Sequence, residues 1–140
     1  MPINFASLHL AVTSALIIFY DVRDHKIYRS HITLALALSV FFISVNSLTF
    51  GFINYLVFEL LHRLTKKGLG KGDVRLSLLI GIYIGHFSPH WQTWVYSNAI
   101  SWILGGIVAM SLLLLRRKRL GDRLAFAPFM FVGLYLSLVI

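Results

Sequence analysis

Charged side chains are confined to a few short segments of this 140-residue chain, and this limits its fold more than any other feature. Asp, Glu, Lys and Arg are absent from residues 1–20, 30–58, 76–115 and 124–140. A helix that crosses a membrane needs about 20 apolar residues, with a lower limit of about 17. The first and last blocks therefore predict one span each, and the 40-residue third block predicts two. A mean hydropathy of +0.79 agrees, because soluble domains of this size are far less apolar.

The second block has 29 residues and fits either one overlong span or a helical hairpin. Asn46, Ser47 and Gly51 are turn-forming residues near its middle and favour the hairpin. Charge decides more firmly, because Lys and Arg in short loops collect on the cytoplasmic side. With a hairpin all 13 basic residues lie on one side, whereas a single span would divide them into three and ten.

The sequence therefore predicts an all-α, polytopic membrane protein that forms a single domain over residues 1–140, with both termini outside. The expected spans are about 4–20, 31–46, 48–63, 73–87, 92–115 and 124–140.

The formal charge of +8 comes from three clusters beside the predicted spans, at residues 23–29, 63–75 and 116–123. No nucleic-acid motif and no soluble domain accompany them, so we expect anionic lipid as the partner and no nucleic acid. Cysteine is absent, which excludes disulfides, thiolate chemistry and a cysteine-based zinc site. His86 and His90 are four residues apart, but Pro89 lies between them in an outer loop, and we expect no metal and no cofactor.

Gly81 and Gly85 place two small residues on one helix face, where a neighbouring helix can approach closely. The neighbour can be another helix of the chain or a second copy, so a homodimer stays open.

Only five acidic residues occur, and the predicted topology places all of them near the cytoplasmic face: Asp21, Asp24, Glu59, Asp73 and Asp122. Acids at membrane level are costly, so each needs a reason. Asp21 directly follows the first predicted span and Asp73 opens the fourth, so the two can meet at the same depth. Such a pair would share one proton, and could hydrolyse a peptide bond with one carboxylate as base and its partner as acid. The alternative is that both simply pair with basic neighbours, as we expect for Asp24 and Asp122. His25 and His31 are near enough in sequence to influence Asp21.

The segment Gly70-Lys71-Gly72-Asp73-Val74-Arg75-Leu76 resembles the Gly-x-Gly-Asp-x-Lys/Arg-Leu signature of the type IV prepilin peptidases, a family of membrane aspartyl proteases. In that family the other catalytic aspartate begins a pattern of Asp, five residues and Ile, and Asp21 is followed by Ile27 at this spacing. Tyr28 and Arg29 stand where the family usually has Pro-Asn. Residues 125–129, Ala-Phe-Ala-Pro-Phe, keep half of the family's Pro-Phe-Gly-Pro-Phe stretch.

The resemblance implies that Asp21 and Asp73 are catalytic and that Gly70 and Gly72 shape the loop beside Asp73. We expect these glycines to allow positive backbone φ angles and close approach of the substrate. Arg75 and Glu59 are candidate substrate-binding residues, although Glu59 can instead pair with Arg63 one turn later.

The substrate implied is a prepilin or pseudopilin precursor, whose leader is cut at the cytoplasmic face of the bacterial inner membrane. The Cys-x-x-Cys pairs of the larger, N-methylating members are missing, so the chain resembles the short, peptidase-only type without an N-terminal methyltransferase region. The loss of Pro-Asn keeps an alternative open: a degenerate homologue, or a small membrane subunit, that binds pilins without cleaving them.

Overall fold

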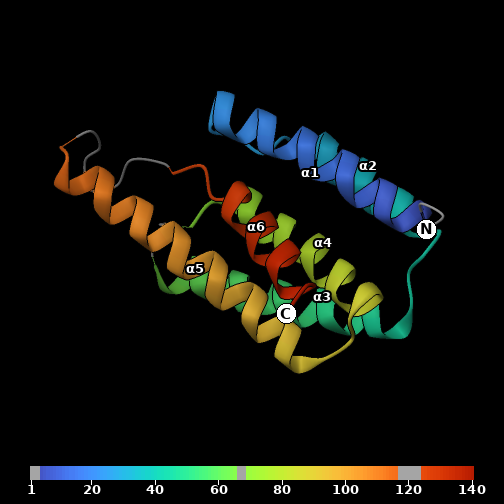
Figure 1. Ribbon diagram of the computed structural model, residues 1–140. Helices are drawn as coiled ribbons and strands as arrows, with labels where there is room; N and C mark the ends of the chain where they lie inside the picture. Colours follow the sequence, from blue (N-terminus) through green and yellow to red (C-terminus); the bar gives the residue numbers. More distant parts are fainter. Residues whose placement is uncertain (1–3, 66–68, 117–123) are drawn as a thin grey trace.

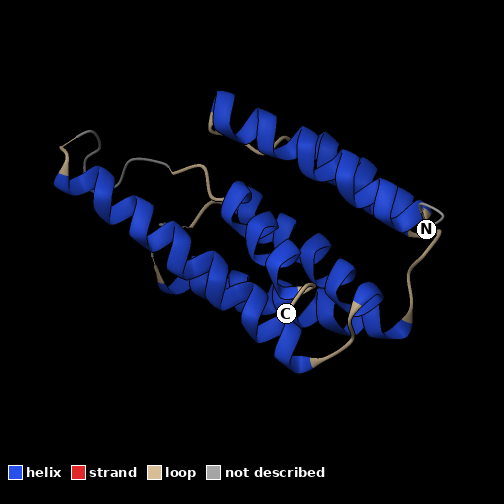
Figure 2. Cartoon of the chain, viewed as in Figure 1, coloured by secondary structure: helices blue, strands red, loops and turns tan. Residues whose placement is uncertain are grey.

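The computed structural model describes residues 4–65, 69–116 and 124–140, and these contain six helices and no strand (Figure 2). The all-α prediction is therefore confirmed for this part of the chain. The helices are α1 (Phe5–Asp24), α2 (Arg29–Ser39), α3 (Val45–Leu64), α4 (Lys71–Phe87), α5 (Trp91–Leu114) and α6 (Ala127–Ser137). Several charged residues discussed above lie outside the described ranges: Lys66, Lys67, Arg117, Lys118, Arg119, Asp122 and Arg123.

The helices pack as three consecutive hairpins, α1 with α2, α3 with α4, and α5 with α6 (Figure 1). Helix α4 lies at the centre and contacts helices of all three hairpins. Nine of the ten residues from Leu76 to Gly85 are buried, Leu78 being the partly exposed one. Helix α1 contacts α2 and α6, so the first and last helices of the chain are neighbours.

The second uncharged block does form two helices, but the break between them is not where the turn-forming residues predicted it. Helix α2 ends at Ser39 and α3 begins at Val45, so Asn46, Ser47 and Gly51 all lie inside α3. The Ser44 side chain caps α3 by accepting a hydrogen bond from the Ser47 amide over 3.2 Å. Asn46, Ser47 and Gly51, which were read as a turn, instead form the contact of α3 with α4.

Two of the helices, Phe5–Asp24 and Trp91–Leu114, are long and apolar enough to cross a membrane by length and composition. Helices α2 and α6 each have 11 residues, which is about 16 Å and short of a hydrocarbon core of about 30 Å. Both are shorter than the sequence predicted, and the arrangement of six spans stays a prediction.

The surface of the bundle is apolar, and many polar side chains are inside it. Helix α1 exposes a continuous apolar stripe of Phe5, Leu8, Val12, Leu16, Phe19 and Val22. Its buried face instead carries His9, Thr13, Ser14 and Asp21. Soluble proteins rarely expose apolar patches of this extent, so the arrangement favours a lipid exterior.

Glycines hold α3 and α4 in close contact, as the spacing of Gly81 and Gly85 predicted. A side chain at Gly81 would collide with the backbone of Phe50 and Gly51, and a Cβ atom at Gly85 would lie 2.5 Å from the Asn46 carbonyl oxygen. Both glycines are buried against α3 of the same chain, so this face is already occupied and the open question of a homodimer does not depend on it.

We predict that Gly81→Ala destabilises the fold, because its Cβ atom must displace the α3 backbone at a cost of about 1–3 kcal/mol. Gly106→Ala on α5 is the matched control, since its Cβ atom meets nothing within 4 Å. Thermal unfolding in detergent measures both. A Gly81→Ala protein as stable as the native one would contradict the packing described for α3 and α4.

Candidate active site

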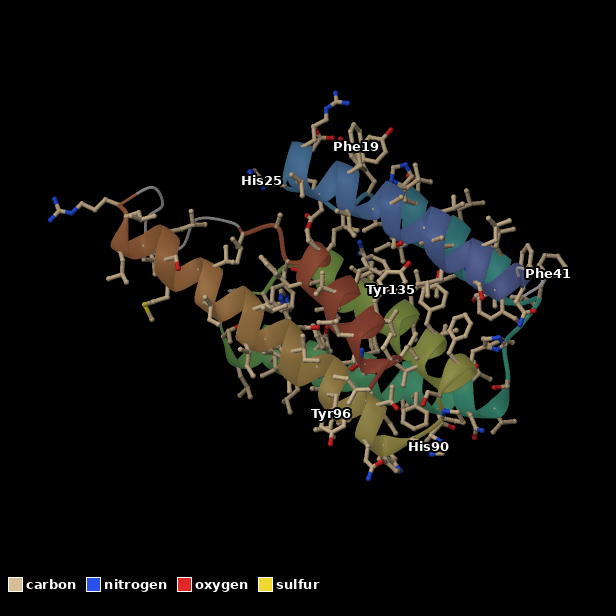
Figure 3. All side chains as sticks on the ribbon, in the orientation of Figure 1. Phe19, His25, Phe41, His90, Tyr96 and Tyr135 are labelled. Atoms are coloured by element: carbon tan, nitrogen blue, oxygen red, sulfur yellow. The ribbon has the colours of Figure 1, made fainter. Side chains whose placement is uncertain are left out.

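A partly open cavity of about 810 Å³ lies where α1 and α3 end and α4 and α6 begin. Figure 3 shows His25, which lines this cavity, at one end of α1, and Phe41 at the opposite end of the molecule. Four sequence-predicted site residues line the cavity together with Asp21, namely Gly70, Gly72, Asp73 and Arg75. The structure thus brings Asp21, which begins the pattern that ends at Ile27, into the same cavity as the Gly-x-Gly-Asp segment.

Asp21 is held by a hydrogen bond from the far end of the chain. It lies in the last two turns of α1, and its side chain is buried, with 4% exposed. Its Oδ2 atom accepts the amide hydrogen of Ala127, the first residue of α6, over 3.0 Å. The first amides of a helix lack partners within it, and the N-cap residue Phe126 supplies no side-chain acceptor. Asp21 therefore caps α6.

The backbone at the start of α4 holds the Asp73 side chain. Asp73 is the third residue of α4, is partly buried, and its Oδ2 atom accepts the Gly70 amide over 3.2 Å. Gly70 has φ −70°, and Gly72 lies inside α4, so the expectation of positive φ angles was wrong. A Cβ atom at Gly70 would lie 2.9 Å from Asp73 Oδ2, so a larger residue here would have to displace this carboxylate.

The two motifs touch through Ile27 and Gly72. A Cβ atom at Gly72 would lie 2.9 Å from the Cβ atom of Ile27, so only glycine lets Ile27 pack this closely on α4. Ile27 belongs to the loop that follows Asp21, and Gly72 directly precedes Asp73. The contact gives a physical reason for the spacing between Asp21 and Ile27. Both carboxylates face the same cavity and lie close enough to interact electrostatically.

Two of the remaining acids have basic partners. Glu59 is not among the cavity-lining residues and accepts a hydrogen bond from Arg63 Nε over 2.8 Å. Its predicted role in binding substrate stays a prediction, and the ion pair gives it a structural role. Asp24 lies 3.4 Å from Arg23 Nε, as expected for a charge partner, and also accepts the Tyr28 hydroxyl over 3.0 Å. This hydrogen bond raises the pKa of the Tyr28 phenol, which stays protonated.

The histidines near Asp21 separate in the structure. His25 lines the cavity, whereas His31 is not among its lining residues and packs against Tyr20 with ring centroids 4.7 Å apart. Within the described ranges, no group of three side chains has the composition to hold a metal ion.

The cavity also has walls that the sequence reading missed. One is His62, which is buried in the last turn of α3 and whose Nδ1 atom lies 2.5 Å from the Leu69 carbonyl oxygen. The spacing of Asn54, Phe58 and His62, four residues apart, places them on one helix face and could have revealed His62 as a buried polar residue. The other wall is the face of α5 formed by Trp102, Gly105, Gly106 and Ala109. Gly105 packs against Phe126, whereas Gly106 has open space beside it.

Comparisons with known proteins give one match. A family model described as the type IV leader peptidase family matches residues 8–110, which include both aspartates, the Gly-x-Gly-Asp segment and most of α5. No curated protein and no solved structure matches the chain.

We predict that Asp21→Ala destabilises the fold, because it leaves the buried Ala127 amide without an acceptor at a cost of about 1–3 kcal/mol. Asp21→Asn keeps a side-chain oxygen that can accept the same bond, so its thermal unfolding in detergent should lie closer to that of the native protein. Equal stability of the alanine variant and the native protein would show that Asp21 does not cap α6.

Proposed function

The chain belongs to the type IV leader peptidase family, and we propose that it is an aspartyl endopeptidase that cuts the leader from prepilin or pseudopilin precursors. The observation that carries this proposal is the shared cavity, because Asp21 and Asp73 come from different helices and line the same space. Family membership gives the reaction class, a peptide hydrolysis. The shared cavity supports Asp21 and Asp73 as the two groups that would perform it.

The chemistry follows from having two carboxylates in one partly dry site. Ionising both is unfavourable, so the pair holds one proton between them. The unprotonated carboxylate takes a proton from a water molecule, whose oxygen attacks the carbonyl carbon of the scissile peptide bond. The protonated partner donates a hydrogen bond to the developing oxyanion. The carbon–nitrogen bond then breaks, and the leaving amine takes a proton from the pair.

The cavity has two kinds of wall that suit a precursor with a charged leader and an apolar segment. The face of α5 that carries Trp102, Gly106 and Ala109 is apolar. It lines the same cavity as the two carboxylates. We propose that the apolar segment lies along α5 while the scissile bond lies at the carboxylates. The start of α4, with Arg75, would then orient the polar part of the substrate.

We further propose that all six helices lie within the bacterial inner membrane, with the cavity end facing the cytoplasm. The support is the apolar exterior and the positions of Arg23, Lys26 and Arg29, which all lie at the cavity end of the bundle. Anionic headgroups would bind there. The short helices α2 and α6 can be accommodated by local thinning of the bilayer and by packing on longer neighbours.

We predict that Asp21→Asn and Asp73→Asn each lower the cleavage rate of a co-expressed prepilin by about 10²–10⁴-fold, the usual contribution of a positioned acid or base. Asp24→Asn is the matched control, because Asp24 lies on the same helix as Asp21, is paired with Arg23 and is not among the cavity-lining residues. Immunoblots of precursor and product, at equal membrane abundance of each variant, provide the measurement.

Normal cleavage by either asparagine variant would remove that residue from catalysis. A native protein that crosslinks to the precursor but cuts none would instead favour the non-catalytic, pilin-binding alternative that the loss of Pro-Asn leaves open.

We predict that Gly106→Phe blocks cleavage without unfolding the protein, because its side chain enters open space in the cavity. Ile103→Phe, about one turn earlier on the same helix, is the control, since Ile103 is 60% exposed and is not among the cavity-lining residues. Initial cleavage rates and thermal unfolding measured together test this. Unimpaired cleavage by a folded Gly106→Phe protein would show that substrate does not use the α5 wall.

A further inference from the structure

His62 and Asp73 bind opposite ends of the same peptide unit. The Leu69 carbonyl oxygen, which only accepts hydrogen bonds, lies 2.5 Å from His62 Nδ1, so this nitrogen carries the proton and donates it. The amide of that peptide unit belongs to Gly70 and donates to Asp73 Oδ2 over 3.2 Å. The chain of contacts therefore runs from the His62 ring through one peptide group to the Asp73 carboxylate.

A peptide group is planar, so its carbonyl and amide turn together. If the Leu69–Gly70 peptide rotates, the bond to His62 and the bond to Asp73 are both lost. The side chain of His62 is well placed to prevent this, because it is 8% exposed and belongs to α3, which packs closely on α4. Leu69 is also buried, whereas Gly70 is exposed and has no side chain of its own to hold the turn.

We propose that His62 is a positioning residue for Asp73, which it orients through the Leu69–Gly70 peptide. His62 acts on the carboxylate only through this peptide, and is not itself a catalytic residue. Misplacing a reacting group by about 1 Å can cost about 100-fold in rate. The effect of losing His62 should therefore appear in kcat, while KM stays near its native value because the α5 wall is unchanged.

The kinetic part of this inference rests on the proposed function, and the amide isosteres of histidine give the sharpest test. Asn places an N–H donor near the position of Nδ1, whereas Gln places its donor near the position of Nε2. We expect His62→Leu and His62→Gln to lower kcat by about 10- to 100-fold, and His62→Asn to stay within about threefold of the native rate. Thermal unfolding of each variant shows whether the loss is merely one of stability.

A second readout needs no substrate. The chain contains no cysteine, so a single Lys71→Cys substitution at the exposed start of α4 takes one spin label. Label mobility at position 71 should rise with His62→Leu and His62→Gln but not with His62→Asn. A label at Ser30→Cys, exposed on α2, should be unaffected by all three.

The two readouts separate failure of the inference from failure of the proposed function. If neither the native protein nor any variant cleaves the precursor, but label mobility at position 71 changes as expected, the proposed peptidase function is overturned. The role of His62 as a positioning residue then stands. Equal kcat, or equal label mobility, for the asparagine and glutamine variants would overturn the inference, and so would a loss of rate that follows thermal stability alone. If His62→Leu does not fold, the asparagine and glutamine pair decides alone.

Discussion

The hydrogen bond between the Ala127 amide and the Asp21 carboxylate joins the last helix to the first, and the candidate site depends on it. A buried carboxylate without a partner would be costly, and so would the uncapped amide at the start of α6. Each satisfies the other across 106 positions of the chain. Asp21 therefore closes the bundle and at the same time stands in the cavity. This double role explains why a residue proposed for catalysis is also expected to matter for stability.

The other carboxylate reaches the same cavity through short-range contacts that need glycine. Gly70 leaves room for Asp73 to bind the backbone at the start of its own helix, and Gly72 leaves room for Ile27 from the loop after α1. The second contact places the loop after α1 against the first turn of α4, which belongs to a different hairpin. The interior of the bundle keeps its helices close with small residues, as where Gly133 of α6 packs on Ser97 and Ser101 of α5. Such packing suits a membrane, where lipid provides little hydrophobic drive for helices to associate.

The sequence allowed the helices to be predicted, because uncharged blocks leave a strong local signal, and it also predicted that Asp21 and Asp73 lie near each other, as they do in the shared cavity. It misplaced the break in the second block, since Asn46, Ser47 and Gly51 have the composition of a turn but serve the contact with α4. It missed His62, whose partner lies across a loop, and could not show that Ala127 pairs with Asp21. Those features depend on which helices become neighbours. It assigned positive φ angles to Gly70 and Gly72, where the structure instead needs space.

The central claim is that Asp21 and Asp73 act as one unit, and a double-mutant cycle on the cleavage rate tests it most directly. Residual cleavage would be measured for Asp21→Asn, Asp73→Asn and the double variant at equal abundance in membranes. Groups that act together lose their effect together, so the account predicts that the double variant cuts no more slowly than either single variant. A double variant slower by the product of the two single effects would mean that the aspartates act independently, and would contradict the shared site.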